Sequence, residues 1–203
     1  MKLYFSPGAC SLSPHIVLRE AGFTFETEKV DLAKKTSASG GNFFAVNPKG
    51  YVPALQLDNG EILTEGPAIV QYVADQRPEK QLAPAHGSLE RYRLIEMLNF
   101  ISTELHKSFS PLFRSNTPEE TKQAARDTLA KRIGFIEQQL QGRDYLMGNQ
   151  FSVADAYLFT VLNWTGHVKI DLAPWPTVQA YMGRVAARPA VRAAMVAEGL
   201  IKE

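Results

Sequence analysis

Residues 1–18 read MKLYFSPGACSLSPHIVL, and this stretch decides the fold of the first part of the chain. Leu3-Tyr4-Phe5 predicts a short strand, which the turn-forming Ser6-Pro7-Gly8 ends. A helical pattern opens at Pro14, because proline lacks an amide that would be unpaired in a first helical turn, and Gly22 ends it. The single cysteine of the chain, Cys10, therefore lies between a strand and a helix.

Short apolar runs and turn signals continue to about residue 80. Residues 27–32 predict a second strand, and residues 54–57 and 62–64 predict a hairpin around Asn59-Gly60. A helix is predicted over residues 67–74. The order strand, helix, strand, hairpin, helix indicates a small α/β domain over residues 1–80.

From residue 88 the pattern is helical almost throughout. Residues 89–112 carry apolar side chains at three- and four-residue spacing, and Thr117 begins a second helix that runs to about residue 140. Ser152 and Asp155 form a variant of the capping box, with Asp where Glu or Gln is usual, before a third apolar helix. Two shorter helices follow. Residues 77–87 form the linker, so we expect an all-α domain over residues 87–203.

Composition excludes several classes of protein. The chain has 203 residues, with 22 basic and 21 acidic side chains, and lacks the basic stripe of a nucleic-acid-binding protein. No apolar run approaches the length of a membrane span, and the N-terminus lacks the apolar stretch of a signal peptide, so we expect a cytoplasmic protein. One cysteine and four scattered histidines predict no internal disulfide and no metal site.

The position of Cys10 allows two interpretations. The positive end of a helix dipole and its unpaired amides favour a thiolate and also bind anions, which indicates a reactive cysteine. Alternatively, Cys10 is a small buried hydrophobic residue, as cysteines outside disulfides often are. Residues 10–13 are Cys-Ser-Leu-Ser rather than Cys-x-x-Cys, so a disulfide at Cys10 would need an external thiol.

Three further segments carry alternatives of the same kind. Residues 50–54, Gly-Tyr-Val-Pro-Ala, allow two interpretations. They form either an ordinary turn or a segment with a cis Val52–Pro53 bond that presents the backbone of Val52 to an extended ligand. Glu65 and Gly66 at a helix start serve either as a solvated cap or as a ligand contact. Polar residues on one face of the long helix form either a solvated face or the lining of a ligand site: Asn99, Thr103, His106 and Lys107.

Taken together, residues 1–15, 46–54, 64–69, 99–107 and 151–155 resemble the motifs of glutathione transferases, specifically the bacterial beta class. The resemblance extends over essentially the whole chain. It implies a thioredoxin-like N-terminal domain, an all-helical C-terminal domain, and a homodimer with one glutathione site per subunit in the interdomain cleft. It also implies that Ser152 and Asp155 belong to the folding motif of the family.

The resemblance also implies roles for individual residues. Cys10 would lie close to the sulfur of glutathione, with which it can form a mixed disulfide. Val52, before Pro53, would pair with the cysteinyl moiety, Glu65 and the amide of Gly66 would hold the γ-glutamyl end, and Lys35 would reach the glycine carboxylate. The helical domain would contribute residues that line the thiol, namely Asn99, Thr103, His106 and Lys107, with Glu104 contributed across the dimer interface. Cys10, His106 and Lys107 would be the catalytic residues, with no metal.

The expected activity is that of a glutathione S-transferase, in which glutathione thiolate attacks a small hydrophobic electrophile in detoxification or xenobiotic catabolism. The apolar pocket for the electrophile would draw on Phe109, Phe113 and Trp164, unless these aromatics are plain core. An alternative is thiol–disulfide exchange, peroxide reduction or reductive dehalogenation through a Cys10–glutathione mixed disulfide. A third hypothesis is a non-catalytic binding or scaffold protein with the same fold.

Overall fold

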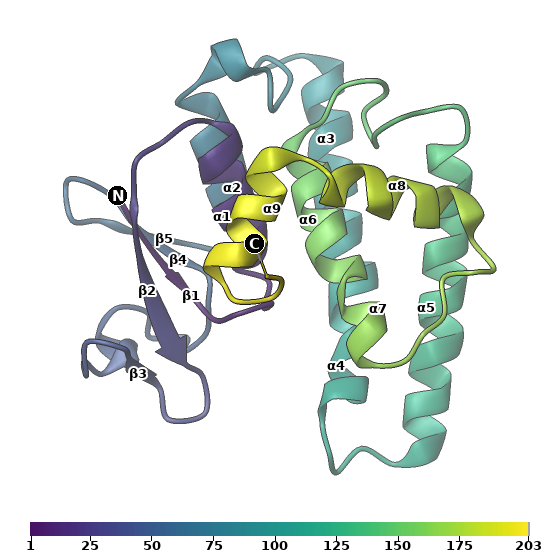
Figure 1. Cartoon of the computed structure of the whole chain (residues 1–203), viewed down its shortest axis with the longest axis horizontal. Helices are drawn as coiled ribbons and strands as arrows, with labels where there is room; N and C mark the ends of the chain where they lie inside the picture. The colour runs from purple at the N-terminus through teal and green to yellow at the C-terminus, as the bar shows by residue number, and fades with distance from the viewer. Residues whose placement is uncertain (203) are drawn as a thin grey trace. The chain divides into compact units, whose positions relative to one another are not determined.

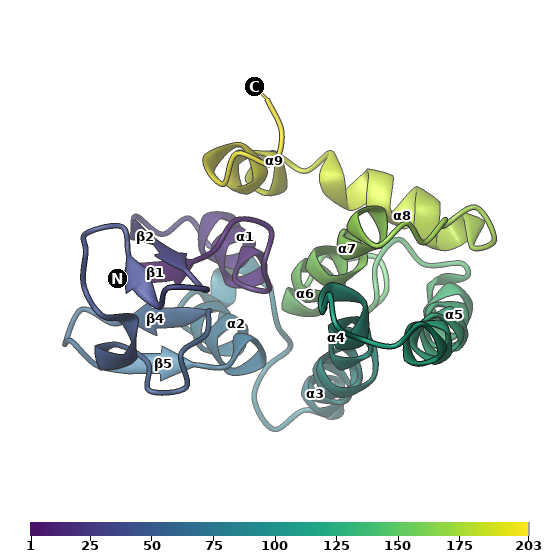
Figure 2. The ribbon, with the colours of Figure 1, turned by 90° about the horizontal axis from the view of Figure 1, so that it is seen from below.

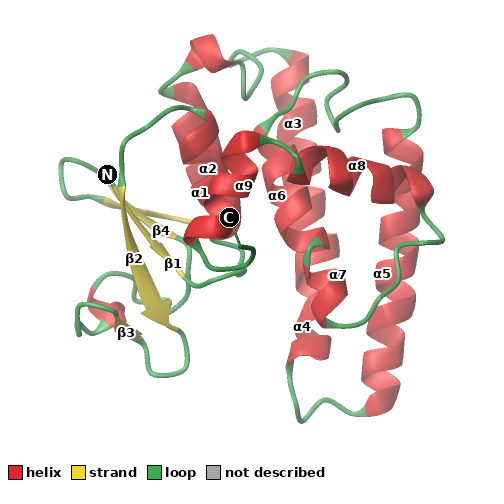
Figure 3. Cartoon of the chain, in the orientation of Figure 1, coloured by secondary structure: helices red, strands yellow, loops and turns green. Residues whose placement is uncertain are grey.

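The computed structural model describes residues 1–202 and divides into two compact units (Figure 1). The first unit contains Met1–Ala83 together with the segment that begins at residue 187, and the second contains Pro84–Ala186. The first unit carries the sheet, and the second is built from helices and loops (Figure 3).

The first unit is built on a five-stranded mixed sheet in the order β3-β2-β1-β4-β5. β1 pairs in parallel with β2, and the remaining neighbours are antiparallel. The predicted hairpin is confirmed, with Ala54 paired to Thr64. No local pattern predicted β3, because it is only two residues long and pairs with the end of β2. The strands are β1 (Lys2–Phe5), β2 (Glu26–Asp31), β3 (Thr36–Ser37), β4 (Ala54–Gln56) and β5 (Ile62–Thr64).

Both faces of this sheet are covered, since successive side chains of a strand point to opposite sides. Helices α1 (Leu12–Glu20) and α2 (Gly66–Asp75) lie side by side on one face (Figure 2), and Phe5 of β1 meets the α1 side chain His15 there, with ring centroids 6.0 Å apart. The neighbouring Tyr4 faces the other way and packs against Phe43 of the 3-10 helix η1 (Phe43–Ala45) at 5.7 Å. A further 3-10 helix, η2 (Pro78–Lys80), follows α2.

Helix α9 (Pro189–Ala197) belongs to the first unit, although it lies near the end of the chain, and packs against α1 (Figures 1 and 2). The guanidinium of Arg188 donates to both carboxylate oxygens of Glu20 at 2.7 and 2.9 Å. The second unit thus ends at Ala186, whereas the helical domain was expected over residues 87–203. The contacts responsible join residues 168 positions apart, which no local pattern reveals.

The second unit consists of helices packed around α6 (Val153–Leu162), in which all ten residues are buried. The predicted helix over residues 89–112 forms, but it contains a π-helical segment, η3 (Ile101–His106). The other helices of this unit are α3 (Leu89–Phe100), α4 (Lys107–Phe113), α5 (Glu119–Leu140), α7 (Trp164–His167) and α8 (Pro176–Ala186).

The predicted capping box at the start of α6 is confirmed. The Oδ2 atom of Asp155 accepts hydrogen bonds from the amide and the hydroxyl of Ser152, both at 2.8 Å. Its Oδ1 atom accepts from the amide of Leu146 at 2.9 Å and from the hydroxyl of Tyr181 at 3.1 Å. Burial raises the pKa of the Asp155 carboxyl, and these hydrogen bonds oppose the rise. The cap therefore ties α6 to a preceding loop and to α8.

A half-buried acid caps α8. Glu137 of α5 accepts hydrogen bonds from the amides of Thr177 and Val178, at 3.0 and 2.8 Å, in the first turn of α8. Burial acts to raise the pKa of Glu137, but the hydrogen bonds lower it overall, so the ionised form is favoured. This contact fixes α8 on α5.

Among residues 1–202, no helix has the length and apolar composition needed to cross a membrane. The same part of the chain places no group of three or more His, Cys, Asp or Glu side chains where they could hold a metal ion.

Candidate active site

Cys10 lies in the turn between β1 and α1, as predicted, and is partly buried without a disulfide partner. Its Sγ atom donates to the carbonyl oxygen of Val52 at 3.3 Å. The turn is held by Ser11, whose hydroxyl donates to the carbonyl of Ser6 at 3.2 Å and accepts from its amide at 3.1 Å. The thiol is thus fixed beside the segment that precedes β4.

The same turn is anchored to the C-terminal segment by a carboxylate that sequence analysis missed. Glu198 is buried and accepts from the amide of Gly8 at 2.9 Å, while its other oxygen lies 2.8 Å from Nδ1 of His15. Arg19 donates to Nε2 of His15 at 3.1 Å. His15, which gave no functional signal in the sequence, therefore serves to connect α1 with the Cys10 turn and Glu198.

The carbonyl groups of three consecutive residues before β4 are each met by a side chain. Gly50 accepts from Nζ of Lys35 at 2.7 Å, Tyr51 accepts from the amide nitrogen of Asn47 at 2.6 Å, and Val52 accepts from Cys10. The cis Val52–Pro53 bond, one of the two alternatives for residues 50–54, is present. Lys35 and Val52 are therefore brought into one region with Cys10, whereas Asn47 was not identified from the sequence.

Glu65 immediately precedes α2 in an unusual backbone conformation. Its φ is 70°, a value that L-residues rarely adopt and that tends to occur at functional sites. Its carboxylate, 56% exposed, pairs with Nζ of Lys49 at 2.5 Å, and Lys49 also donates to Thr64 at 3.0 Å. The hydrogen bond to Glu65 raises the pKa of Lys49. Gly66 follows as the buried first residue of α2.

The polar residues of the long helix make different contacts. Thr103 donates through its hydroxyl to the carbonyl of Asn99 at 3.0 Å, and both residues are exposed, as is Lys107. Glu104 instead pairs with Arg132 of α5 at 2.6 Å. Thr103 and Glu104 lie in the π-helical segment η3, which the prediction of a regular α-helix did not include.

His106 ends η3 and points to aromatic side chains of the second unit. Its Nδ1 atom lies 2.7 Å from the hydroxyl of Tyr157, and its ring meets Trp164 edge-on at 4.8 Å. Phe109 and Phe113 each meet Trp164 at 5.6 Å. Phe109 and Trp164 are buried, but Phe113 is 52% exposed, so of the three aromatics named above only Phe113 presents a large apolar surface.

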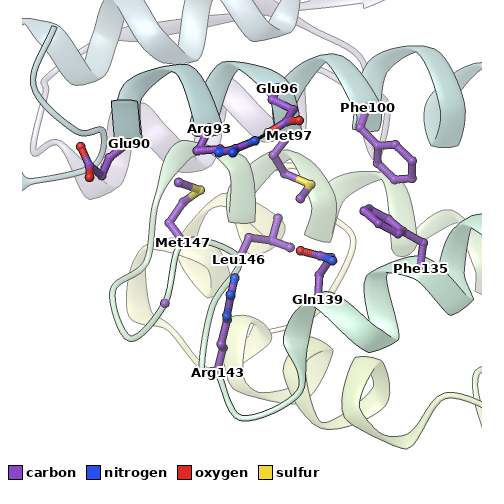
Figure 4. A pocket seen from close by; sticks show the side chains of 11 residues that line it. Glu90, Arg93, Glu96, Met97, Phe100, Phe135, Gln139, Arg143, Leu146 and Met147 are labelled. Carbon is purple, nitrogen blue, oxygen red and sulfur yellow. Dashed lines mark hydrogen bonds and ion pairs between the residues drawn. The ribbon is translucent and has the colours of Figure 1, made fainter. Parts of the chain in front are cut away.

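The second unit also has a groove of about 750 Å³ between α3, α5 and the loop at residues 143–148 (Figure 4). The rings of Phe100 and Phe135 face each other there, with centroids 4.8 Å apart. Arg93 and Glu96 form an ion pair on the α3 side at 2.8 Å. The other side chains that line the groove are Glu90, Met97, Gln139, Arg143, Leu146 and Met147.

The first unit has a thioredoxin-like fold with a single cysteine before its first helix, and the same chain also carries a helical unit. These features together indicate the class of protein. Models of known families match both parts of the chain. Residues 8–76 match the N-terminal domain of glutathione S-transferases, and residues 100–189 match their C-terminal domain.

Individual relatives are similar over nearly the full length. Glutathione S-transferase GstA of Escherichia coli O157:H7 is 52% identical, covering 98% of this chain and 100% of its own. A sphingomonad glutathione S-transferase solved with glutathione is 54% identical, with a TM-score of 0.96 and coverage of 99% and 100%. A bacterial beta-class glutathione S-transferase of Sphingomonas chungbukensis is 52% identical, with the same TM-score and coverage. The chain belongs to the glutathione S-transferase family, and the predicted resemblance to the beta class is confirmed.

Proposed function

We propose that this protein conjugates reduced glutathione to small hydrophobic electrophiles. The observation that carries the proposal is the 3.3 Å hydrogen bond from Cys10 Sγ to the carbonyl of Val52. It places a thiol beside the extended backbone on which a peptide ligand would pair. A cysteinyl residue bound to Val52 would therefore bring its own sulfur next to Cys10. Family membership supports conjugation over the alternative of reduction through a mixed disulfide.

The remainder of glutathione would be held by charged and backbone groups of the same unit. Glu65 would accept from the γ-glutamyl ammonium, and the amide of Gly66 would donate to its carboxylate at the start of α2. Lys35, held at Gly50, would reach the glycine carboxylate. Pro53 would fix the backbone of Val52. These contacts match an extended ligand with one ammonium and two carboxylates.

In the reaction, the sulfur of glutathione attacks an electrophilic carbon that carries a leaving group. The S–H proton is lost to solvent, an S–C bond forms, and the leaving group departs as an anion. We propose that Cys10, His106 and Lys107 stabilise the thiolate, because hydrogen bonds and positive charge favour the ionised form of a thiol. Asn99, Thr103 and Glu104 would assist in binding, with Glu104 contributed to the site of a partner subunit. Phe113 would contact the electrophile.

The direct test measures binding and turnover of the purified chain. We expect retention on immobilised glutathione with elution by free glutathione, and conjugation of an activated aryl chloride followed by the absorbance of the thioether. Absence of both retention and turnover would overturn the proposal. Binding without turnover, together with tight binding of large apolar ligands, would instead favour a scaffold protein.

Cys10→Ala separates conjugation from the reductive alternative. Since the attacking sulfur belongs to glutathione, the variant should conjugate within about 10-fold of the native rate, whereas exchange through a Cys10 mixed disulfide should vanish. Loss of both activities to the same extent would mean that Cys10 itself is the nucleophile.

We further propose that the protein acts as a homodimer in the cytoplasm, where glutathione is kept reduced, in detoxification of electrophiles. The groove between α3 and α5 fits a second copy of this chain. It has an apolar centre with Met97 and Phe135, and Phe135 is 39% exposed. Around this centre lie two acids and two bases. In a two-fold dimer the patch of one copy meets the same patch of the other copy. A patch that carries both acids and bases can therefore be complementary to itself. The four charged residues are Glu90, Glu96, Arg93 and Arg143.

Met97→Glu should weaken this dimer by about 30-fold or more, because it places a charge at the apolar centre of the interface. Sedimentation velocity across a concentration series measures the change. Tyr92→Glu is the matched control, because Tyr92 also lies on α3 and is 62% exposed but does not line the groove. A native chain that sediments as a monomer, or a Met97→Glu variant as dimeric as the native chain, would contradict the proposal.

A further inference from the structure

The imidazole of His106 is held by two aromatic side chains of the helical unit. Its Nδ1 atom lies 2.7 Å from the hydroxyl of Tyr157, and the two rings are nearly perpendicular, at 76° with centroids 6.0 Å apart. Trp164 meets the imidazole at 4.8 Å and 72°. The ring position of His106 is therefore set by packing, and one of its two nitrogens is engaged by Tyr157.

Tyr157 is itself placed by the most buried helix of this unit. It lies on α6, of which every residue is buried, and is only 2% exposed. The capping box of Ser152 and Asp155 starts this helix a few residues earlier. Because the backbone of Tyr157 is fixed in this way, its hydroxyl is a rigid partner for the more exposed His106.

The chemistry of the two groups favours one direction for their hydrogen bond. A phenol hydroxyl, with a pKa near 10, is a good donor, and the unprotonated nitrogen of a neutral imidazole is a good acceptor. The 2.7 Å contact fits either tautomer, and this pairing of donor and acceptor strengths favours donation from the hydroxyl of Tyr157 to Nδ1. In a neutral imidazole only one nitrogen carries hydrogen, so acceptance at Nδ1 puts the proton on Nε2.

We propose that Tyr157 is a positioning residue that holds neutral His106 in the Nε2–H tautomer. This inference rests on the proposed function, in which His106 acts on the sulfur of glutathione. In the Nε2–H tautomer the second nitrogen donates a hydrogen bond to the thiolate and takes no proton from the thiol. In the opposite tautomer the same nitrogen would be a base. Tyr157 thus selects the donor role for His106.

Nuclear magnetic resonance of the chain labelled with ¹⁵N-histidine tests the tautomer directly. His106→Gln identifies the signals of His106 in spectra recorded at about pH 9, well above the reference imidazole pKa of about 6.5. We expect a single Nε2–H tautomer in the native chain and a mixture of tautomers in Tyr157→Phe. An Nδ1–H tautomer in the native chain, or an unchanged Nε2–H pattern in Tyr157→Phe, would overturn the proposal.

Tyr181→Phe is the matched control. It removes the hydroxyl of another buried tyrosine, which bonds Asp155 rather than His106. The control should lower stability and leave the tautomer of His106 unchanged. A tautomer shift of equal size in both variants would show that general loosening of the helical unit, not the Tyr157 hydroxyl, is responsible.

Kinetics provide the second readout. Tyr157→Phe should lower kcat for conjugation by about 10-fold, as expected for one lost hydrogen bond, and change KM for glutathione by less than about 2-fold. In a His106→Gln background the same substitution should have no further effect, because the two residues act through one contact. Additive losses would indicate a purely structural role. If the native chain shows no conjugation, the proposed function fails, whereas the tautomer measurement still decides the role of Tyr157.

Discussion

Replacing Asp155 with alanine is expected to lower the free energy of unfolding of the helical unit by roughly 3–5 kcal/mol. The carboxylate accepts four hydrogen bonds from Leu146, Ser152 and Tyr181, all of which are buried. Alanine leaves the donors of Leu146 and Ser152 without this acceptor, whereas the Tyr181 hydroxyl keeps the backbone carbonyl of residue 155, and each unsatisfied buried donor costs about 1–3 kcal/mol. It also removes the cap that starts α6, the central helix of the unit.

Urea unfolding followed by tryptophan fluorescence measures this effect selectively. Both tryptophans of the chain, Trp164 and Trp175, belong to the helical unit, so their signal reports on that unit alone. Asp127→Ala on α5 is the matched control. Asp127 is exposed and bonds only Gln123 among the contacts described, so its loss should cost less than about 0.5 kcal/mol. Equal transition midpoints for Asp155→Ala and Asp127→Ala would show that the cap contributes little.

Replacing Glu65 with alanine is expected to lower kcat/KM for glutathione by roughly 10- to 100-fold, the value of one or two hydrogen bonds to a charged group. Glu65 is the carboxylate proposed to hold the ligand ammonium. Alanine keeps a Cβ atom and therefore the same backbone cost at a φ of 70°. Stability should change little, because the ion pair between Glu65 and Lys49 is about half-exposed on both sides.

Initial rates at limiting glutathione and retention on immobilised glutathione check this prediction. Glu61→Ala is the control, because Glu61 is an exposed acid of the neighbouring hairpin and changes the net charge equally. Lys49→Ala tests the partner of Glu65 separately. If Glu65→Ala and Glu61→Ala bind glutathione equally well, the carboxylate of Glu65 does not hold the ligand.

Local signals in the sequence predicted much of the first unit. In the second unit they predicted the capping box at the start of α6. The strand, turn and helix around Cys10, the hairpin around Asn59-Gly60 and the capping box at Ser152 each depend on neighbours within a few residues. Such signals act through backbone preferences and caps, and they need no knowledge of the rest of the fold. They were sufficient to place Cys10 correctly between β1 and α1.

The partners of the candidate site residues were less predictable. The sequence indicated Lys35, Val52 and Glu65 but gave no reason to connect Asn47 with Tyr51, or Lys49 with Glu65. It also assumed a regular helix through residues 89–112, where the π-helical turn of η3 redirects Glu104 to Arg132 and His106 to Tyr157. A π-turn depends on the packing of the surrounding helices, and residue spacing alone does not record it.

Local sequence patterns established the residue types of the site, the turn that carries Cys10 and the family resemblance. Only the tertiary structure decided that Glu198 holds the Cys10 turn through Gly8, that residues from 187 onward join the first unit, and that Tyr157 engages His106. Gly8 and Glu198 lie 190 positions apart in the sequence, and His106 and Tyr157 lie 51 positions apart. Long-range partners are selected by the packing of whole elements, because burial of a polar group requires a partner from whichever element lies opposite.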